Sequence, residues 1–272
     1  MASTPNPAVA FPVYLHLGTH IIHPHLFFEA LSYITAFVAY LNMRRRFGDP
    51  IPTPLRWAVI APAVAGAALG ARLGFWLEDP LLTWRNVHNP AYLLSGKTIV
   101  GALAGGLLAV ELVKRYVGLR ESTGDLYAVP LATGIATGRL GCFFTGLSDN
   151  TCGTPSKLPW AVDFGDGIPR HPTQLYEILF LLFLIPPLFY VLKRISPGCA
   201  VEDSIQNPRF LPGDAFRLFM VSYVTFRLLC DFIKPYPRLF LGLGGIQWGC
   251  VLLLFYYFRD IVRWLSNVER VT

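Results

Sequence analysis

Charged side chains are scarce in this sequence. Only 15% of its 272 residues are Asp, Glu, Lys or Arg, whereas soluble domains usually carry about 25%. Hydrophobic residues make up 53%, and the mean hydropathy is +0.46. The net charge of +6 does not indicate a nucleic-acid partner, because the basic residues are not gathered in one patch. This composition argues against a soluble protein and predicts an all-α integral membrane protein with several spans.

Metal-binding and redox motifs are also missing. The five cysteines form no CxxC pair, and the spacing of the histidines offers no zinc pattern. We therefore expect no metal and no organic cofactor. Cys142 and Cys152 share one loop region. They could form a disulfide if that region lies outside the cytoplasm, or both could be free thiols.

Targeting segments and long linkers are absent as well. Residues 1–12 contain no basic n-region and no A-x-A site before a polar mature start, so we expect no cleavable signal peptide. The sequence has no low-complexity tail, and none of its polar connections is long enough to be a linker between domains. The sequence therefore predicts one transmembrane domain over residues 1–272.

Apolar runs fill most of the chain. Seven are long enough, or nearly so, to cross a membrane. They cover residues 25–43, 56–77, 97–113, 126–143, 174–192, 214–233 and 244–262. The fifth contains Pro186 and Pro187, which predicts a kinked or short helix.

Lys and Arg residues gather in every alternate connection between these runs. Basic connections face the cytoplasm. The sequence therefore predicts about seven spans with the N-terminus outside and the C-terminus inside. The polar connection 144–171 then faces outward.

Small residues recur at spacing four within the runs. This spacing allows close approach of helix backbones in lipid, although a glycine beside a lipid headgroup is an alternative interpretation. The residues concerned are Gly66, Gly70, Gly74, Gly101, Gly105, Gly134 and Gly138.

Several ionisable residues lie inside the apolar runs, where they are expensive and usually functional. They are Glu29, Arg72, Glu78, Lys97, Arg139, Glu177, Arg227 and Asp231. Counting the helical rise places Arg139 and Arg227 roughly 20 Å from the cytoplasmic side. This agreement predicts one polar cavity open toward the outer leaflet. The alternative is structural ion pairing, for example between Arg227 and Asp231 at i and i+4.

Several arginines at the level of a phospholipid headgroup favour a phosphate site, because Arg presents a planar fork of donors and stays charged. His171 either anchors a helix start or acts as a general base. Gln174, Tyr176 and Glu177 either lie at the interface or line the headgroup site.

Two segments at expected helix starts are similar in sequence, and this similarity is called the internal echo below. The segment His23 to Glu29 (HPHLFFE) resembles His171 to Glu177 (HPTQLYE), since each places His-Pro six residues before Glu. The echo reflects either a duplication or the same solution to starting a helix at the outer interface.

Four motifs resemble a known family. Gly138-Arg139-Leu140-Gly141-x-Phe143 looks like the start of the signature of bacterial prolipoprotein diacylglyceryl transferase. The segment 171–177 is close to that family's H-P-[ST]-Q-L-Y-E, and 223–232 resembles its sixth-helix R-F-x-x-E-[FW] region. Gly245-Ile246-Gln247 resembles the M-G-Q that opens its last helix. The order of the motifs and the predicted topology fit over most of the chain.

The resemblance implies a reaction and a setting. Such an enzyme would move a diacylglyceryl group from phosphatidylglycerol to the lipobox cysteine thiol of a prolipoprotein, in the bacterial cytoplasmic (inner) membrane. The family's two essential arginines correspond to Arg139 and Arg227, which would activate the donor phosphate, and His171 would handle the thiol proton. The remaining expected substrate-binding residues are Gln174, Tyr176, Glu177, Asp231, Gly153 and Lys97.

The chain departs from the family pattern at several positions. Val100 stands where the family has a histidine before its third helix, and Cys142 and Thr145 stand at signature asparagines. The signature glutamate falls near Leu147, and Asp231 replaces the sixth-helix glutamate. Two alternatives therefore stay open: a paralogue acting on a different acceptor, and a non-catalytic phospholipid-binding or transport protein.

Overall fold

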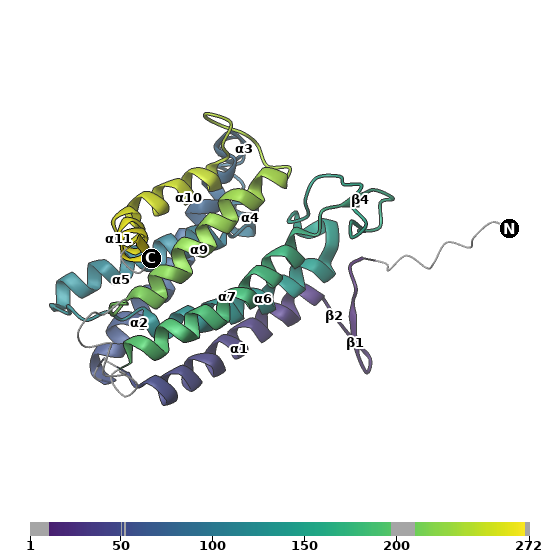
Figure 1. Ribbon diagram of the computed structural model, residues 1–272. Helices are drawn as coiled ribbons and strands as arrows, with labels where there is room; N and C mark the ends of the chain where they lie inside the picture. Colours follow the sequence, from purple (N-terminus) through teal and green to yellow (C-terminus); the bar gives the residue numbers. More distant parts are fainter. Residues whose placement is uncertain (1–10, 50, 52, 197–209, 270–272) are drawn as a thin grey trace. The chain divides into compact units, whose positions relative to one another are not determined.

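The computed structural model describes residues 11–49, 51, 53–196 and 210–269, and these form two compact units (Figure 1). The first contains the described residues of 1–47, 126–199 and 232–235; the second contains those of 48–125, 200–231 and 236–272. The described residues are mostly helical, as predicted. The prediction missed four short strands among them: β1 (Leu15–Leu17) pairs antiparallel with β2 (His20–Ile22), and β3 (Val162–Asp163) with β4 (Pro169–Arg170).

The first unit is built on three long helices. They are α1 (Pro24–Phe47), α6 (Asp125–Thr145) and α7 (Thr173–Ile195), with a 3-10 turn η1 (Gly146–Asp149) after α6. Pro24 opens α1, where its missing N–H is not needed. Gly134 on α6 allows close contact with α1, because a Cβ there would lie 3.0 Å from the Ala36 Cβ. The Thr35 hydroxyl also donates to the Thr137 hydroxyl over 3.2 Å.

The second unit holds the remaining helices of the described chain. They are α2 (Thr53–Glu78), α3 (Pro80–Arg85), α4 (Pro90–Ser95), α5 (Ile99–Val117), α9 (Asp214–Cys230), α10 (Gly245–Tyr256) and α11 (Phe258–Glu269). A 3-10 turn η2 (Asp231–Ile233) follows α9, and its residues from Phe232 onward belong to the first unit. The short helices α3 and α4 were not predicted from the sequence. They begin where the side chains of Asp79 and Asn89 accept backbone N–H groups of Leu82 and Tyr92.

Helices α2 and α5 approach through their glycines. A Cβ at Gly70 would lie 2.2 Å from the Gly101 carbonyl oxygen, and one at Gly105 would lie 2.2 Å from the Gly66 carbonyl oxygen. No other residue fits at such a backbone contact. The packing interpretation of this glycine stripe is therefore confirmed.

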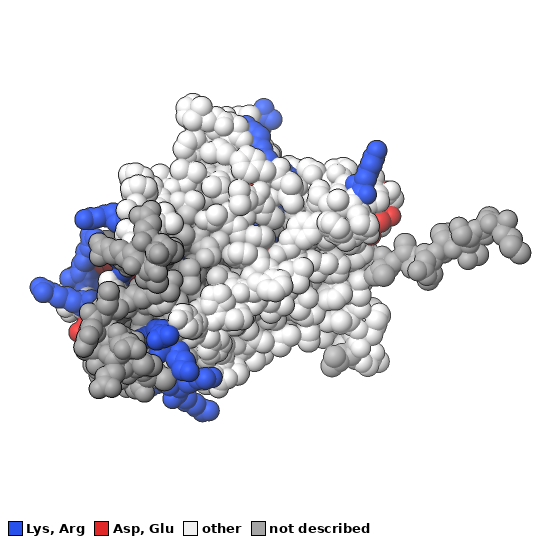
Figure 2. Space-filling model, viewed as in Figure 1, with Lys and Arg blue, Asp and Glu red and all other residues white. Residues whose placement is uncertain are grey.

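Three described helices are long and apolar enough to cross a membrane: Pro24–Phe47, Leu55–Glu78 and Thr173–Ile195. Their outer faces carry large exposed apolar side chains such as Leu69 on α2 and Phe183 on α7. Most of the surface visible in Figure 2 bears no Lys, Arg, Asp or Glu. A surface of this kind is suited to lipid rather than to water.

Two predicted runs differ from the structure. The run 244–262 is not one helix, since α10 ends at Tyr256 and α11 begins at Phe258. For the run with Pro186 and Pro187 the short-helix alternative is wrong, because α7 contains both prolines and is 23 residues long. The kinked alternative stays a prediction. Neighbouring groups can satisfy the backbone carbonyls that a proline leaves free in an apolar helix.

Candidate functional site

A buried ion pair joins α6 and α7 in the first unit. The Arg139 Nε lies 2.9 Å from the Glu177 Oε2, and the two side chains are only 8% and 1% exposed. Gly141 lets α1 pass close to this part of α6, because a Cβ there would lie 2.8 Å from the Phe28 Cβ. The G-R-x-G motif therefore combines a guanidinium with a glycine at a close helix contact. Glu177 neutralises Arg139, as the ion-pairing interpretation allowed, and holds it in one orientation.

His171 lies just before α7, and its ring contacts the side chain of Tyr176. Its Nδ1 is 3.2 Å from the Tyr176 hydroxyl, which also accepts a hydrogen bond from the Trp160 Nε1 over 2.8 Å. The backbone of His171 is fixed as well. It donates to the Thr154 carbonyl over 3.1 Å and accepts from the Gly153 N–H over 2.9 Å. The imidazole is therefore positioned by both the loop and the first turn of α7.

Gly153 is the tightest point of this arrangement. A Cβ at this position would lie 2.6 Å from the His171 Cβ and 2.9 Å from its carbonyl oxygen. This close approach gives a physical reason for a glycine at position 153.

We expect Gly153→Ala to push His171 away from Tyr176. The resemblance assigns the thiol proton to His171, and a small displacement of a group in that role should lower transfer activity about 10- to 100-fold. The measurement is the initial rate of lipid transfer to an acceptor peptide by equal amounts of folded protein. Gly249→Ala is the control, since its nearest neighbour, the Val100 Cγ1, is 3.6 Å away. Equal rates for both variants would contradict the positioning of His171 by Gly153.

The side-chain amide nitrogen of Gln174 holds the loop before α7. Its Nε2 donates to the Thr151 hydroxyl over 3.1 Å and to the Cys152 Sγ over 3.4 Å. Cys142 and Cys152 are both buried free thiols, so the disulfide alternative is wrong for this structure. Burial raises the pKa of the Cys152 thiol, even though Gln174 favours the thiolate. Gln174 therefore orients the loop, while burial keeps the Cys152 thiol protonated.

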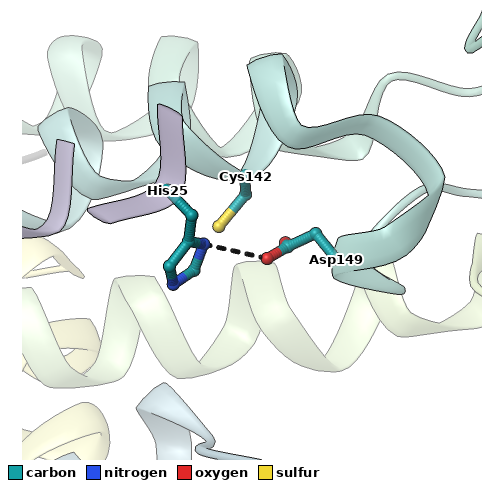
Figure 3. A group of neighbouring side chains, drawn as sticks. All are labelled: His25, Cys142 and Asp149. Atoms are coloured by element: carbon teal, nitrogen blue, oxygen red, sulfur yellow. Dashed lines mark ion pairs between the residues drawn. The ribbon is translucent and has the colours of Figure 1, made fainter. Parts of the chain in front are cut away.

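A cluster that was not predicted from the sequence lies near Arg139. His25 from α1, Cys142 from α6 and Asp149 from η1 point toward one another (Figure 3). The His25 Nδ1 is 3.1 Å from the Asp149 Oδ1. Burial alone would raise the pKa of Asp149, but hydrogen bonds from His25 and Thr151 hold it below its ordinary value. The echo between residues 23–29 and 171–177 was the one local signal, and it highlighted His23 rather than His25.

The second unit contains its own buried pair. The Arg227 Nη2 lies 2.9 Å from the Asp231 Oδ1, with side chains 7% and 1% exposed. The predicted i, i+4 pairing is therefore confirmed. Arg238 was not predicted, yet its Nη2 donates to the Asp231 carbonyl over 3.0 Å and its Nη1 donates to the Gln247 side chain.

Gln247 explains the Gly-Ile-Gln motif at the start of α10. Its Nε2 donates to the Leu228 carbonyl on α9 over 3.1 Å, while its Oε1 accepts from the Gly244 N–H over 2.9 Å. The same amide thus caps α10 and ties it to α9. A shallow pocket lies beside these residues, lined in part by Glu78, Asp231 and Arg238.

Lys97, Arg72 and Val100 also belong to the second unit. Lys97 is exposed just before α5, and Arg72 donates to the Gly96 carbonyl over 2.6 Å. Val100, which aligns with the family histidine, is 3% exposed. A buried valine offers no proton acceptor, so any base for the thiol must come from another part of the chain.

Comparison with known proteins identifies the family. The sequence matches the family described as "Prolipoprotein diacylglyceryl transferase" over residues 11–264. A phosphatidylglycerol–prolipoprotein diacylglyceryl transferase of Bordetella avium is 31% identical, over 95% of this chain and 95% of its own length. The protein of that name from Geobacter sulfurreducens is 32% identical over 89% of each chain. That from Methylococcus capsulatus is 29% identical over 89% of this chain and 90% of its own. The chain therefore belongs to the prolipoprotein diacylglyceryl transferase family.

Proposed function

We propose that this protein transfers a diacylglyceryl group from phosphatidylglycerol to the lipobox cysteine thiol of a prolipoprotein, with release of glycerol phosphate. Relatives that cover nearly the whole chain carry this activity in their names. The observation that carries the proposal is the burial and ion pairing of Arg139 and Arg227, which correspond to the family's two essential arginines. Arg139 and Arg227 are both buried, and each lies against a buried carboxylate, Glu177 and Asp231 respectively.

The chemistry needs what these arginines offer. The acceptor sulfur attacks the glycerol carbon, the carbon–oxygen bond to phosphate breaks, and the electron pair leaves with the phosphate oxygen. Negative charge therefore grows on the phosphate in the transition state. Arg139 and Arg227 bind that phosphate and stabilise the growing charge with oriented, permanently charged donors. Glu177 and Asp231 fix the two guanidinium groups before the lipid arrives.

His171 is the candidate for handling the thiol proton. Its ring is oriented by Tyr176, and Gly153 and Gln174 hold the loop on which it depends. A positioned imidazole can accept a proton near neutral pH. Lys97, being exposed, contributes a positive charge that attracts the anionic headgroup.

The proposed setting is the bacterial inner membrane, with a single transmembrane domain of about seven spans. Basic residues in the last turns of α1, α5 and α7 support an outside-to-inside direction for each of these helices. The N-terminus and the connection 144–171 would then lie outside the cytoplasm, on the side where secreted prolipoproteins present their thiols.

A second candidate keeps the donor and changes the acceptor. The buried Val100 and the thiol of Cys142 replace polar family residues, whereas both arginines are kept. A paralogue that uses phosphatidylglycerol with another acceptor would show this combination. A protein that only binds or transports phospholipid would keep the arginines without any transfer.

Complementation tests these functions. A strain depleted of its own transferase should grow when it expresses this protein, and its lipoproteins should gain the mass of a diacylglyceryl group. Arg227→Ala should abolish both effects, while Arg259→Ala, outside the proposed site, should not. If the wild type is membrane-inserted and well expressed but leaves prolipoproteins unmodified, the prolipoprotein proposal fails. Loss of radiolabelled phosphatidylglycerol in that strain would then indicate another acceptor.

A further inference from the structure

Three side chains of the types that bind zinc meet in the first unit, although they lie far apart in the sequence. We propose that His25, Cys142 and Asp149 form a zinc site whose open fourth position takes the acceptor thiolate. The metal site itself rests only on these three residues. Its role in activating a thiol rests on the proposed transferase function.

The geometry is close to that of a three-ligand zinc site. The nitrogen, sulfur and oxygen ligand atoms all lie within 4.8 Å of one another, and the His25 Nδ1 to Asp149 Oδ1 distance is 3.1 Å. In a tetrahedral site with bonds of about 2.0–2.3 Å, such atoms lie about 3.3–3.8 Å apart. Movements of about 1 Å or less at the side chains would therefore bring the ligands to bonding distance.

Each ligand already has an outer partner that would hold it in place. The other ring nitrogen of His25, Nε2, faces the Glu29 Oε2 at 3.7 Å. The second oxygen of Asp149 accepts from the Thr151 hydroxyl over 2.6 Å, and the Arg139 Nη1 donates to the Cys142 Sγ over 3.7 Å. Carboxylate and hydroxyl partners of this kind orient zinc ligands and strengthen their binding.

The site is open on one side. The His25 side chain is 40% exposed, whereas the Asp149 side chain is 10% exposed and Cys142 is buried. Three protein ligands and one accessible position are typical of catalytic zinc, whereas structural zinc is closed by four. A thiolate and a carboxylate would also balance the metal's two positive charges, which suits an apolar environment.

The contact between Cys142 and Arg139 connects this cluster to the donor site. Arg139 is proposed to bind the phosphate that leaves, and the open metal position would hold the thiolate that attacks. On binding zinc, the acceptor thiol would release its proton to water. Its sulfur would then form the bond to the glycerol carbon as the carbon–oxygen bond breaks and the electron pair passes to the phosphate oxygen. A metal-bound thiol needs no side-chain base, because the metal lowers its pKa. This accounts for the valine at position 100.

Cys142 itself is a poor alternative nucleophile. If its sulfur took the diacylglyceryl group, the product would be a thioether, which does not pass the group to a second thiol. If Cys142 is instead a metal ligand, its thiol takes part without forming this unreactive thioether.

Metal analysis of the purified full-length protein tests the proposal without any activity measurement. Protein that has been loaded with Zn²⁺ and desalted should contain about one zinc ion per chain, as measured by inductively coupled plasma mass spectrometry. His25→Ala and Cys142→Ser should reduce the zinc content at a fixed free concentration at least tenfold. Cys152→Ser is the matched control, because Cys152 is also a buried free thiol of the first unit but lies outside the cluster. Asp149→Asn gives a third, milder variant, and monodisperse elution confirms folding.

Cobalt supplies a second readout. Co²⁺ in the site should show a near-ultraviolet thiolate charge-transfer band in the wild type and in Cys152→Ser, and this band should vanish in Cys142→Ser. Absence of zinc and of the cobalt band in folded wild type overturns the proposal, even if lipid transfer occurs. Bound zinc in a protein that transfers no lipid upholds the site and instead overturns the proposed function.

Discussion

Arg139→Gln is expected to reduce the rate of lipid transfer by roughly 10²- to 10³-fold, the effect of removing a donor that stabilises transition-state charge. The same change removes the Arg139 guanidinium from the Glu177 carboxylate, whose side chain is only 1% exposed. Loss of one partner of a buried pair costs about 3–5 kcal/mol of stability. Activity and stability should therefore fall together in this variant.

A double variant separates the two effects. Combining Arg139→Gln with Glu177→Gln also removes the negative charge of the buried Glu177 side chain. The thermal midpoint should therefore recover toward that of the wild type. The rate should remain low, because the phosphate still lacks its guanidinium. Arg170→Ala is the control for loss of an arginine, since Arg170 pairs with Asp166 on the same unit but at the surface. Recovery of the rate along with the stability would show that Arg139 is only structural.

Gly105→Ala is expected to disrupt the second unit. Its Cβ would lie 2.2 Å from the Gly66 carbonyl oxygen and 2.8 Å from the Gly70 Cα, both backbone atoms that cannot rotate away. Alanine favours an isolated helix over glycine by about 1 kcal/mol. Here the clash should outweigh that gain and destabilise the protein by about 3 kcal/mol or more.

The neighbouring residue provides the matched control. Gly106 lies on the same helix, but a Cβ there would meet its nearest atom, the Ala63 carbonyl oxygen, at 3.4 Å. Gly106→Ala should therefore keep a thermal midpoint near or slightly above that of the wild type. The measurement is the thermal midpoint and the monodisperse fraction in detergent. Similar stability for both variants would contradict the α2–α5 contact.

Local features of the sequence were enough to predict most of the helices and one of the two buried arginine–carboxylate pairs. The lengths of the apolar runs predicted α1, α2 and α7 as membrane-spanning helices. The i, i+4 spacing of Arg227 and Asp231 predicted their ion pair. Spacing did not identify the carboxylate that pairs with Arg139, because both Glu29 and Glu177 lie in apolar runs. Spacing along the chain does not say which face of α7 turns toward α6, and the structure selects Glu177.

Other features depend on tertiary contacts that no local pattern contains. His25, Cys142 and Asp149 come from three different elements, so no spacing rule for metal ligands applies to them. Arg238 lies in an irregular connection and gains its place through Asp231 and Gln247. The break at Tyr257 falls within a continuous apolar run, where hydropathy alone cannot separate one helix from two.

The most direct test of the account is transfer by the purified protein. Wild type in detergent or vesicles containing phosphatidylglycerol is mixed with a synthetic lipobox peptide, and the peptide is analysed by mass spectrometry. The account predicts a mass increase of one diacylglyceryl group on the cysteine, together with release of glycerol phosphate, and loss of both when the peptide cysteine is replaced by serine. An unmodified peptide in the presence of folded wild type, under conditions where a relative from Bordetella avium modifies it, would contradict the account.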